Sequence, residues 1–399
     1  MRILWVKAGR ILPVNTGGRI RSFNILRHLA RQHDVTFLSY YDGPRDAAYE
    51  SDLAREFPGS IAMPSGLGGS FTSRVLAYAT HLHLAAPFAV SKFSTPAVRR
   101  AVSAALAQRP DVAVCDFLAA SLNFDDPLPV PTVLFQHNVE SALWDRQATH
   151  ERNLVKRIAF TMEAAKMRRY EAKAVRRFSH VIAVSEHDRT LMSAMRPASD
   201  ITSVPTGVDV AAFRDTGGTQ AEPGNVMFLG SMDWPANIDG VDFFVREVWP
   251  LVLAKVPTAR FNVVGRNPPK RILDLASDSV RIVGGVETVT PHLHRASVFV
   301  VPLRIGGGTR LKIYEGMAAS LPIVSTRVGA EGLDYTAGTD ILIEDDPAGF
   351  ASSVVSLLTD EARRRAIGDA ALATAMRFDW SVVAADFARV LETVRSAPK

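Results

Sequence analysis

The chain has 399 residues, a hydrophobic share of 47%, a charged share of 22% and a net charge of +5, a composition that argues against disorder and fibrous repeats. Its length exceeds what one hydrophobic core usually fills, so two domains of roughly 200 residues each are expected. Cys115 is the only cysteine, which excludes an intramolecular disulfide and a thiolate metal site.

The first half of the chain has the pattern of a parallel α/β sheet, in which short β-branched runs alternate with helical stretches. Apolar residues at helical spacing predict a helix over Arg19–Gln32. The apolar run at the N-terminus, Met1–Val6, is too short for a signal peptide, so a cytoplasmic location is expected. The predicted strands are Ile3–Val6, Val35–Leu38, Val112–Cys115, Thr132–Phe135 and Val181–Val184.

Positive charge is concentrated in this first half. Residues 1–200 hold 26 Lys and Arg against 18 Asp and Glu, a net charge of +8. Within residues 151–177, nine Lys and Arg accompany three Asp and Glu. This stretch predicts either a solvated helix face or a surface that rests on an anionic membrane or on nucleic acid. No recognised nucleic-acid-binding motif accompanies the charge, so no specific nucleic-acid partner is expected.

The regular pattern stops between Arg196 and Asn225, a segment rich in Pro, Gly, Thr and Asp. An N-terminal domain over 1–204, a linker over 205–224 and a C-terminal domain over 225–379 are therefore predicted. The last helical stretch, within 380–399, either closes the second domain or crosses back to the first. The second series of strands is predicted at Val226–Leu229, Ala259–Val264, Val280–Val283, Val298–Val301 and Pro322–Ser325, with helices at Asn237–Val256 and Arg310–Ala319.

A glycine-rich segment in the second half is the most informative one for function. A predicted buried strand ends at Val301, then come Gly306, Gly307 and Gly308, and a helix begins near Thr309. Glycines let the backbone approach a phosphate closely, and the free N–H groups of a helix N-terminus attract an anion. The segment is neither a Walker loop nor a dinucleotide fingerprint.

Charged side chains surround this loop in sequence. Arg304, Arg310 and Lys312 supply positive charge where a leaving diphosphate would need it. Glu315 lies one to two helical turns in, where a carboxylate accepts hydrogen bonds from ribose or sugar hydroxyls. Because Lys312 and Glu315 are three residues apart, a plain ion pair on the helix surface is the alternative interpretation.

Polar groups in the first half supply further candidates. The pair Gly17-Gly18 precedes the first predicted helix and is interpreted either as a phosphate or acceptor loop or as a plain turn. His137 follows the strand predicted at Thr132–Phe135, and ligands of doubly wound sheets bind at such strand ends. Asp116 and Glu140 also follow strands, either as acceptor contacts or as loop carboxylates. No spacing of His, Asp and Glu predicts a metal site.

Taken together, these segments resemble the family 4 retaining glycosyltransferases of the GT-B fold, most closely the exopolysaccharide-type sugar transferases. The resemblance spans nearly the whole chain, and its specificity lies in the order and spacing of the motifs. They are Gly17-Gly18 with Arg21, His137-Asn138, Val184-Ser185, Pro205–Asp209, Phe228–Asp233, Val264–Arg266, Gly306–Glu315, Pro322–Thr326 and Gly329–Gly332.

The resemblance implies two Rossmann-like doubly wound domains that face each other across a cleft. It implies transfer of a sugar, with retention, from a nucleotide-diphosphate sugar to a saccharide or lipid-linked acceptor in cell-surface polysaccharide or glycolipid synthesis. No cofactor or metal ion would be required. The enzyme would be cytoplasmic and peripheral at the inner face of the cytoplasmic membrane, with residues 151–177 against an anionic surface.

The resemblance also implies roles for single residues. The carboxylate of Glu315 would bind the ribose hydroxyls, and His137 would lie near the transferred sugar. Gly17, Gly18 and Arg21 would lie near the diphosphate and the acceptor. The predicted catalytic group is His137, Arg310, Lys312 and Glu315, and the predicted donor-binding group is Gly230, Arg266, Arg304, Gly306, Gly307, Gly308, Thr309 and Glu315.

Two positions depart from the family pattern. Gly307 stands where family members often carry a glutamate that contacts the sugar. Ser231-Met232-Asp233 follows Gly230, where family members commonly carry an Arg and a Lys. Arg304, Arg310 and Lys312 are expected to replace those cations, with Arg266 as a further candidate. Three alternatives stay open: a non-catalytic or divergent sugar-nucleotide-binding protein, a GT-B sugar-nucleotide epimerase, and a phosphorylase, for which no pyridoxal phosphate lysine can be named.

Overall fold

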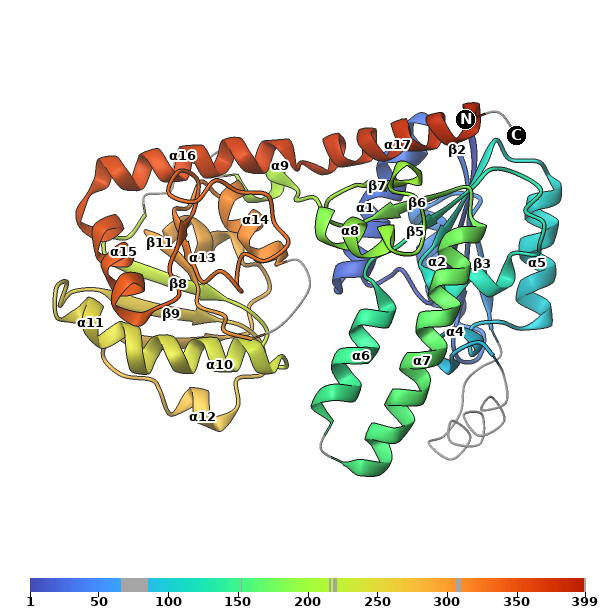
Figure 1. The fold of residues 1–399 in the computed structure, drawn as a ribbon. Helices are drawn as coiled ribbons and strands as arrows, with labels where there is room; N and C mark the ends of the chain where they lie inside the picture. Colours follow the sequence, from blue (N-terminus) through green and yellow to red (C-terminus); the bar gives the residue numbers. More distant parts are fainter. Residues whose placement is uncertain (66–84, 152, 215–216, 218–220, 306–309, 398–399) are drawn as a thin grey trace. The chain divides into compact units, whose positions relative to one another are not determined.

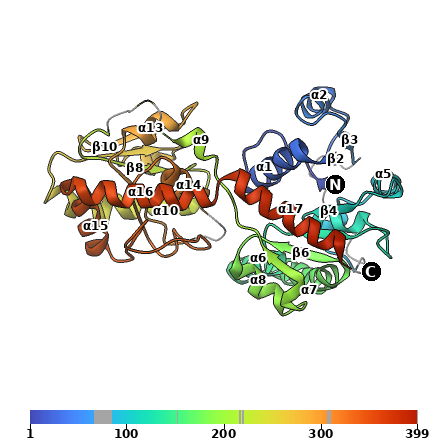
Figure 2. The same cartoon turned by 90° about the horizontal axis from the view of Figure 1, so that it is seen from above.

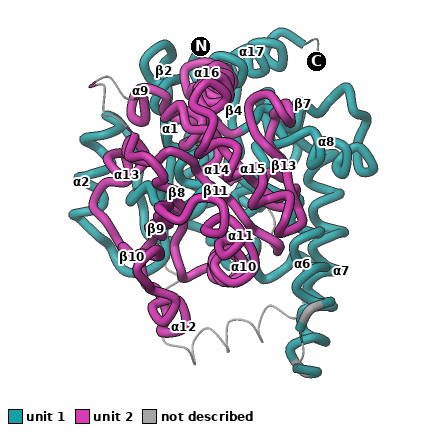
Figure 3. The backbone as a smooth tube through the Cα atoms, turned by 90° about the vertical axis from the view of Figure 1, so that its left-hand side faces the viewer, with its two compact units in different colours: residues 1–205, 383–399 teal, residues 206–382 magenta. Residues whose placement is uncertain are grey.

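The computed structural model describes residues 1–65, 85–151, 153–214, 217, 221–305 and 310–397 (Figure 1). The chain divides into two compact units, which Figure 3 shows in teal and magenta. Unit 1 contains residues 1–205 and 383–399, and unit 2 contains residues 206–382. Each unit has its own parallel sheet and its own hydrophobic core, so the predicted pair of Rossmann-like domains is confirmed.

Unit 1 is built on a seven-stranded parallel sheet of order β3-β2-β1-β4-β5-β6-β7. The order reverses between β1 and β4, and in such sheets the crevice at the carboxyl ends of the two strands is where ligands bind. The strands are β1 (Arg2–Ala8), β2 (Asp34–Tyr41), β3 (Ile61–Pro64), β4 (Val112–Asp116), β5 (Thr132–Phe135), β6 (His180–Ala183) and β7 (Ile201–Ser203).

Helices cover both faces of this sheet (Figures 1 and 2). They are α1 (Gly17–Gln32), α2 (Ala47–Glu56), α4 (Phe88–Ser91), α5 (Pro96–Ala107), α6 (Glu140–His150), α7 (Leu154–Arg177) and α8 (Glu186–Ser193), with short 3₁₀ turns η1 (Leu118–Asn123) and η2 (Ala198–Asp200). Cys115 lies in the core, where burial raises the pKa of its thiol. Its side chain is part of the apolar packing of unit 1.

Unit 2 is built on a six-stranded parallel sheet of order β10-β9-β8-β11-β12-β13, which reverses between β8 and β11. Its strands are β8 (Asn225–Leu229), β9 (Arg260–Val264), β10 (Val280–Gly284), β11 (Val298–Val301), β12 (Ile323–Ser325) and β13 (Leu342–Ile343). Its helices are α9 (Val210–Phe213), α10 (Pro235–Phe243), the π-helical η3 (Phe244–Val248), α11 (Trp249–Leu253), α12 (Lys270–Leu273), α13 (Thr290–Arg295), α14 (Leu311–Ala318), α15 (Pro347–Thr359) and α16 (Glu361–Arg377).

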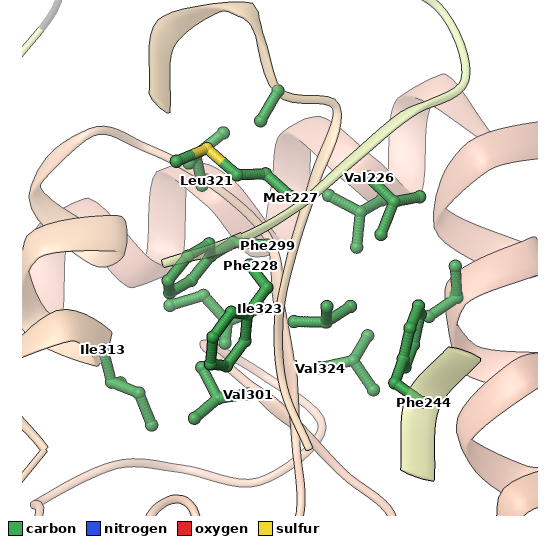
Figure 4. Close-up of a cluster of buried hydrophobic side chains, with 14 of the residues drawn as sticks. Val226, Met227, Phe228, Phe244, Phe299, Val301, Ile313, Leu321, Ile323 and Val324 are labelled. Atoms are coloured by element: carbon green, nitrogen blue, oxygen red, sulfur yellow. The ribbon is translucent and has the colours of Figure 1, made fainter. Parts of the chain in front are cut away.

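The core of unit 2 fixes the orientation of α14. Phe228, Phe299 and Ile323 come from three neighbouring strands and pack in one apolar cluster, to which α14 contributes Ile313 (Figure 4). Strands buried on both faces are apolar along most of their length, which is why their sequences read as continuous hydrophobic runs. Ile313 anchors α14 in this cluster, and Lys312, on an adjacent face of the helix, lies beside the ring of Phe228.

The predicted helix over Asn237–Val256 is interrupted. Pro250 has no backbone N–H and cannot donate to the preceding turn, and the chain passes through the π-helical η3 just before it. Three strands were missed by the sequence pattern: β3, β7 and β13 have four, three and two residues. The missed strands are only partly buried, whereas equally short strands that were predicted, such as β5 and β12, are buried along their whole length and lie in apolar runs.

Residues 205–224, predicted as a linker, belong to unit 2 from Thr206 onward and include the short α9. The Val208 N–H donates to the Phe378 carbonyl at 2.9 Å, and the Trp380 N–H donates to the Val208 carbonyl at 3.1 Å. These bonds tie the segment to the end of α16. The final helix, α17 (Trp380–Ser396), begins in unit 2, and its residues from Val383 onward belong to unit 1.

Within the described part of the chain, no helix combines the length and the apolar character needed to cross a bilayer.

Candidate functional site

The first group of candidate residues lies at the carboxyl edge of the unit 2 sheet, where the strand order reverses. Gly230 follows β8, and Lys312 and Glu315 lie on α14, the helix that follows β11. Gly306, Gly307, Gly308 and Thr309 lie outside the described residues. The described part of the site is therefore the β8–α10 connection and the first turns of α14.

Lys312 is enclosed by neighbouring groups of unit 2. Its ammonium nitrogen donates to Asn237 Oδ1 at 2.8 Å and lies 4.5 Å from the centroid of the Phe228 ring. A Cβ added to Gly230 would come within 2.6 Å of this nitrogen, so a glycine is needed for the lysine to approach so closely. Asn237 Nδ2 in turn donates to the Ser231 carbonyl at 2.7 Å, which holds the amide in place.

Burial shifts the pKa values of Lys312 and Glu315, which both lie on α14. The pKa of Lys312 is lowered to about 7, mainly by burial; Glu315 opposes the shift, and the charge of Arg310 adds to it. Burial raises the pKa of Glu315, and Lys312 opposes that shift. The protonation of Lys312 therefore changes near neutral pH. An anionic ligand beside it would favour the protonated form.

Arg310 occupies the N-cap position of α14. The carbon of its guanidinium lies 4.9 Å from the centroid of Trp234, and burial lowers its pKa while Glu331 opposes that shift. Arg310 and Lys312, when protonated, thus place two positive charges at the helix N-terminus, whose dipole also favours an anion. Asn237 and Trp234 were missed by sequence reasoning, because their contacts depend on how α10 packs beside α14.

Two other predicted cations, Arg304 and Arg266, form ion pairs with carboxylates. Arg304 donates to both oxygens of Asp239, at 2.8 and 3.1 Å, and its guanidinium lies 3.5 Å from Glu247. Arg266 forms an ion pair of 3.0 Å with Asp233. The structure therefore brings Arg310 and Lys312 together at α14, whereas Arg304 and Arg266 are paired with carboxylates of unit 2.

The second group of candidate residues lies at the carboxyl edge of the unit 1 sheet. His137, after β5, shares a hydrogen bond of 2.7 Å between Nε2 and Asp116 Oδ1. The other oxygen of Asp116 accepts from Lys7 Nζ at 3.1 Å and from Trp5 Nε1 at 2.9 Å. Lys7 also donates to Ser22 Oγ at 3.1 Å. Strands β1, β4 and β5 and helix α1 therefore contribute to one buried polar network.

This network fixes the charge state of His137. Burial alone would raise the pKa of Asp116, but Lys7 and His137 hold it well below its usual range. Burial lowers the pKa of His137 to about 4, although Asp116 opposes that shift. At neutral pH the imidazole is neutral. Because an ionised Asp116 only accepts, the ring carries its proton on Nε2, and Nδ1 keeps a free lone pair.

The glycine pair and Arg21 belong to the same edge of unit 1. Gly17 and Gly18 open α1, and a Cβ on Gly18 would lie 3.8 Å from Nδ1 of His137. Arg21 is buried, and burial lowers its pKa to about 9, while Asp188 and Asp116 oppose the shift. Its Nε has no hydrogen-bond partner among the described residues. The structure thus places these predicted residues with His137.

A carboxylate from α7 supports the loop that carries His137. Glu171 is fully buried. Its oxygens accept from Gln136 Nε2 at 3.1 Å, from the N–H groups of Glu140 and Ser141 at 2.8 and 3.0 Å, and from Ser141 Oγ at 2.5 Å. Glu171 therefore caps the N-terminus of α6 from a different helix. The sequence analysis missed both Glu171 and Lys7. Lys7 could have been noticed, because it directly follows the apolar run Ile3–Val6.

Within the described residues, no group of three or more His, Cys, Asp and Glu side chains is arranged to hold a metal ion.

These two sheets and the polar groups at their carboxyl edges define a GT-B type of protein. Residues 16–212 match the family described as "Glycosyltransferase Family 4", and residues 223–360 match the one described as "Glycosyl transferases group 1". The two matches together cover most of the chain, which belongs to the family 4 glycosyltransferases of the GT-B fold.

Individual proteins agree with this assignment. The phosphatidyl-myo-inositol mannosyltransferase of Mycolicibacterium smegmatis is 31% identical over 265 residues, which cover 63% of this chain and 65% of that protein. The chain therefore matches just under two thirds of the length of this relative.

Two solved structures share the fold at low sequence identity. HepE of Anabaena in complex with UDP has a TM-score of 0.67 and 14% identity, over 98% of this chain and 100% of that one. The sucrose-phosphate synthase of Thermosynechococcus elongatus has a TM-score of 0.72 and 17% identity, over the whole of both chains.

Proposed function

We propose that this protein transfers a sugar, with retention, from a nucleotide-diphosphate sugar to a saccharide or lipid-linked acceptor. The observation that carries the proposal is the environment of Lys312 in unit 2. A lysine with a pKa of about 7 is enclosed beside Arg310 at a helix N-terminus and lies next to Glu315. This arrangement suits a diphosphate, with ribose hydroxyls on the carboxylate.

The chemistry follows from the charge that develops on the leaving group. As the bond between the anomeric carbon and the phosphate oxygen breaks, negative charge grows on the diphosphate, which Lys312 and Arg310 stabilise. The acceptor oxygen forms its bond to the anomeric carbon on the same face, and its proton passes to the departing phosphate. In this proposal the positive charge at the diphosphate comes from side chains, so no metal ion or cofactor is required.

The polar network of unit 1 is proposed to contact the sugar and the acceptor. Neutral His137 offers Nδ1 as a hydrogen-bond acceptor next to Gly18, and Asp116 and Lys7 hold the ring in that orientation. A relative that is named a phosphatidyl-myo-inositol mannosyltransferase, and HepE in complex with UDP, support a glycolipid or saccharide acceptor and a nucleotide donor.

We place the reaction in cell-surface polysaccharide or glycolipid synthesis, at the inner face of the cytoplasmic membrane. The basic stretch 151–177 is proposed to face the anionic membrane surface there.

Calorimetric titration with UDP, GDP and ADP tests the donor site. We expect one of the three to bind selectively and Glu315→Ala to weaken that binding by about tenfold or more, because the ribose loses a charged hydrogen-bond partner. Glu361→Ala, which removes an exposed carboxylate of α16, is the control and should bind as the unchanged protein does. If no nucleotide binds even at millimolar concentration, the proposal fails.

Turnover distinguishes the enzyme from a sugar-nucleotide-binding protein. With the selected nucleotide as its hexose ester, we expect release of nucleoside diphosphate that depends on an added acceptor. The anomeric configuration of the product, read by NMR, would equal that of the donor. Tight binding without turnover would favour the non-catalytic alternative, and an inverted product would contradict retention.

A further inference from the structure

The long helices α6 and α7 form a hairpin that extends away from the strands of the unit 1 sheet (Figure 1). They pack on each other through Trp144 and Phe160, whose ring centroids lie 6.0 Å apart, and through an ion pair of 2.7 Å between Arg168 and Asp145. The inner face of α7 is buried at residues such as Met167. The hairpin is therefore an ordered part of unit 1.

The outer face of α7 carries an apolar stripe near the tip of the hairpin. Leu154, Ile158 and Met162 are exposed to 61%, 55% and 50%. Their spacing of four residues puts them on one side of the helix. We call these three side chains the tip stripe. Scattered exposed hydrophobic residues are common, but a row of three large ones at the end of a projecting hairpin indicates an interaction surface.

Positive charge surrounds the tip stripe. Lys156, Arg157, Arg169 and Lys173 are all exposed, and within the described part of the chain none of them forms an ion pair. Arg176 and Arg177, by contrast, donate to backbone carbonyls of unit 1. A second copy of the hairpin would bring like charges together. A surface rich in lipid phosphates would complement both the cations and the apolar side chains.

We propose that the tip of the α6–α7 hairpin inserts into the interface of an anionic bilayer. The tip stripe would enter the boundary between headgroups and acyl chains, and Arg169 and Lys173 would contact lipid phosphates. The inference deepens the membrane partner of the proposed function, since it adds an apolar anchor to the electrostatic attraction. Binding should therefore weaken with salt but persist in part at high ionic strength.

Co-sedimentation with vesicles tests the anchor. The triple variant L154Q/I158Q/M162Q should bind vesicles of equal phosphatidylglycerol and phosphatidylcholine about tenfold more weakly than the unchanged protein, and should lose the salt-resistant part of the binding. The control is L191Q/L251Q/M376Q, which replaces three exposed apolar side chains on other helices. Equal binding by the tip variant and the control would overturn the proposal.

A second variant separates charge from apolar insertion. R169Q/K173Q should weaken binding at low salt and leave the salt-resistant part unchanged, and pure phosphatidylcholine vesicles should bind all variants weakly. If the protein instead sediments as a dimer in solution that the tip variant dissociates, the stripe is an interface between copies and the membrane proposal is wrong.

Titration with the nucleotide distinguishes a loss of membrane binding from a loss of the donor site. The tip variant should bind the selected nucleotide like the unchanged protein, which shows that it is folded. Loss of vesicle binding with nucleotide binding intact supports the anchor. If the unchanged protein binds vesicles but no nucleotide, the membrane anchor is supported and the proposed transferase activity is wrong.

Discussion

Single residues of unit 2 determine how closely a positive charge can approach the end of β8. Gly230 matters because any side chain there would collide with Lys312 and Asn237. Gly265, in the next strand connection, is needed for a different reason, since a Cβ there would overlap the carbonyl oxygen of Gly230. A Cβ at Gly230 would collide with side chains, whereas a Cβ at Gly265 would collide with the backbone.

This contrast predicts different effects for the two alanine variants. Gly230→Ala should displace the lysine and weaken nucleotide binding by about tenfold, with a change in unfolding free energy below about 1 kcal/mol, because the end of a flexible side chain can move. Gly265→Ala should cost several kcal/mol of stability, roughly 3 or more, because backbone must shift. Chemical denaturation and calorimetry measure both. Equal destabilisation by the two variants would contradict this account.

The pKa of Lys312 predicts a pH dependence of donor binding. In the free protein its charge is present below pH 7 and is lost as the pH rises through about 7. A bound diphosphate raises that pKa, so affinity should be full below pH 7 and fall by up to about tenfold per pH unit above it, with proton uptake on binding.

The measurement uses the hexose ester of the selected nucleotide, whose diphosphate does not titrate in this range. Lys312→Met should bind more weakly at pH 6 and lose the pH dependence. A pH profile shared by the protein and this variant would show that another group is responsible.

Lys312 and Glu315 could be proposed from the sequence, because both lie in a segment whose glycines and charges indicate an anion site by themselves. It was not sufficient for Asn237, whose amide meets the lysine only after α10 and α14 pack together. Arg304 shows the opposite limit. Its position near the glycine loop predicts a phosphate contact, and only the structure shows that its guanidinium is paired with Asp239 of α10.

Among the elements, the start of α6 depends on a residue that is distant in sequence. Glu171 of α7 accepts hydrogen bonds from two N–H groups at the start of α6 and from Gln136, which directly precedes His137. Burial, together with the nearby Glu171, raises the pKa of Glu140 to about 7. The cap therefore connects the stability of the hairpin to the position of the candidate histidine.

Glu171→Gln should destabilise unit 1 by about 2–3 kcal/mol, because an amide N–H₂ would face donors that need an acceptor. If transfer activity is established, its rate should fall more than its donor affinity does, since His137 shifts while unit 2 is unchanged. Glu186→Gln, an exposed change on α8, is the control. A variant as stable as the control would show that Glu171 is not an effective cap.

Most strands could be predicted from sequence because buried parallel strands have a continuous apolar signature, as in Thr132–Phe135 and Val298–Val301, whose bounds the structure reproduces. The π-helical turn at Phe244–Val248 could not, because it depends on how a proline is accommodated within a packed helix. The cap on α6 likewise could not be predicted, because Glu171 lies on a different helix from the N–H groups that it accepts from.

At the scale of the whole molecule, the C-terminal part of α17 completes the core of unit 1. Phe387 stacks on Trp5 at a centroid distance of 5.4 Å and meets Phe135 edge-on at 5.0 Å. Trp5 in turn donates to Asp116. The last helix is therefore connected to the polar network of unit 1 through Trp5 and also through Phe135, whose ring centroid lies 4.5 Å from that of His137.

Phe387→Ala should destabilise unit 1 by about 3–5 kcal/mol through the cavity that it leaves. Unfolding followed by the fluorescence of the tryptophans should show the unit 1 transition at lower denaturant, while nucleotide binding by unit 2 is retained under native conditions. Val382→Ala, on the exposed side at the start of α17, should have little effect. Loss of stability in both variants alike would argue against a specific role for the aromatic contact.

Unit 1 is formed by two separate segments of the chain, and this affects the order in which the units can fold during synthesis. Residues 206–382 must leave the ribosome before Phe387 is available to cover Trp5. Unit 2 can therefore bury its own core first, although domains usually fold in the order in which they are made. A nascent chain that stalls after unit 2 would carry one finished domain and one with an open aromatic core, a ready signal for chaperones and proteases.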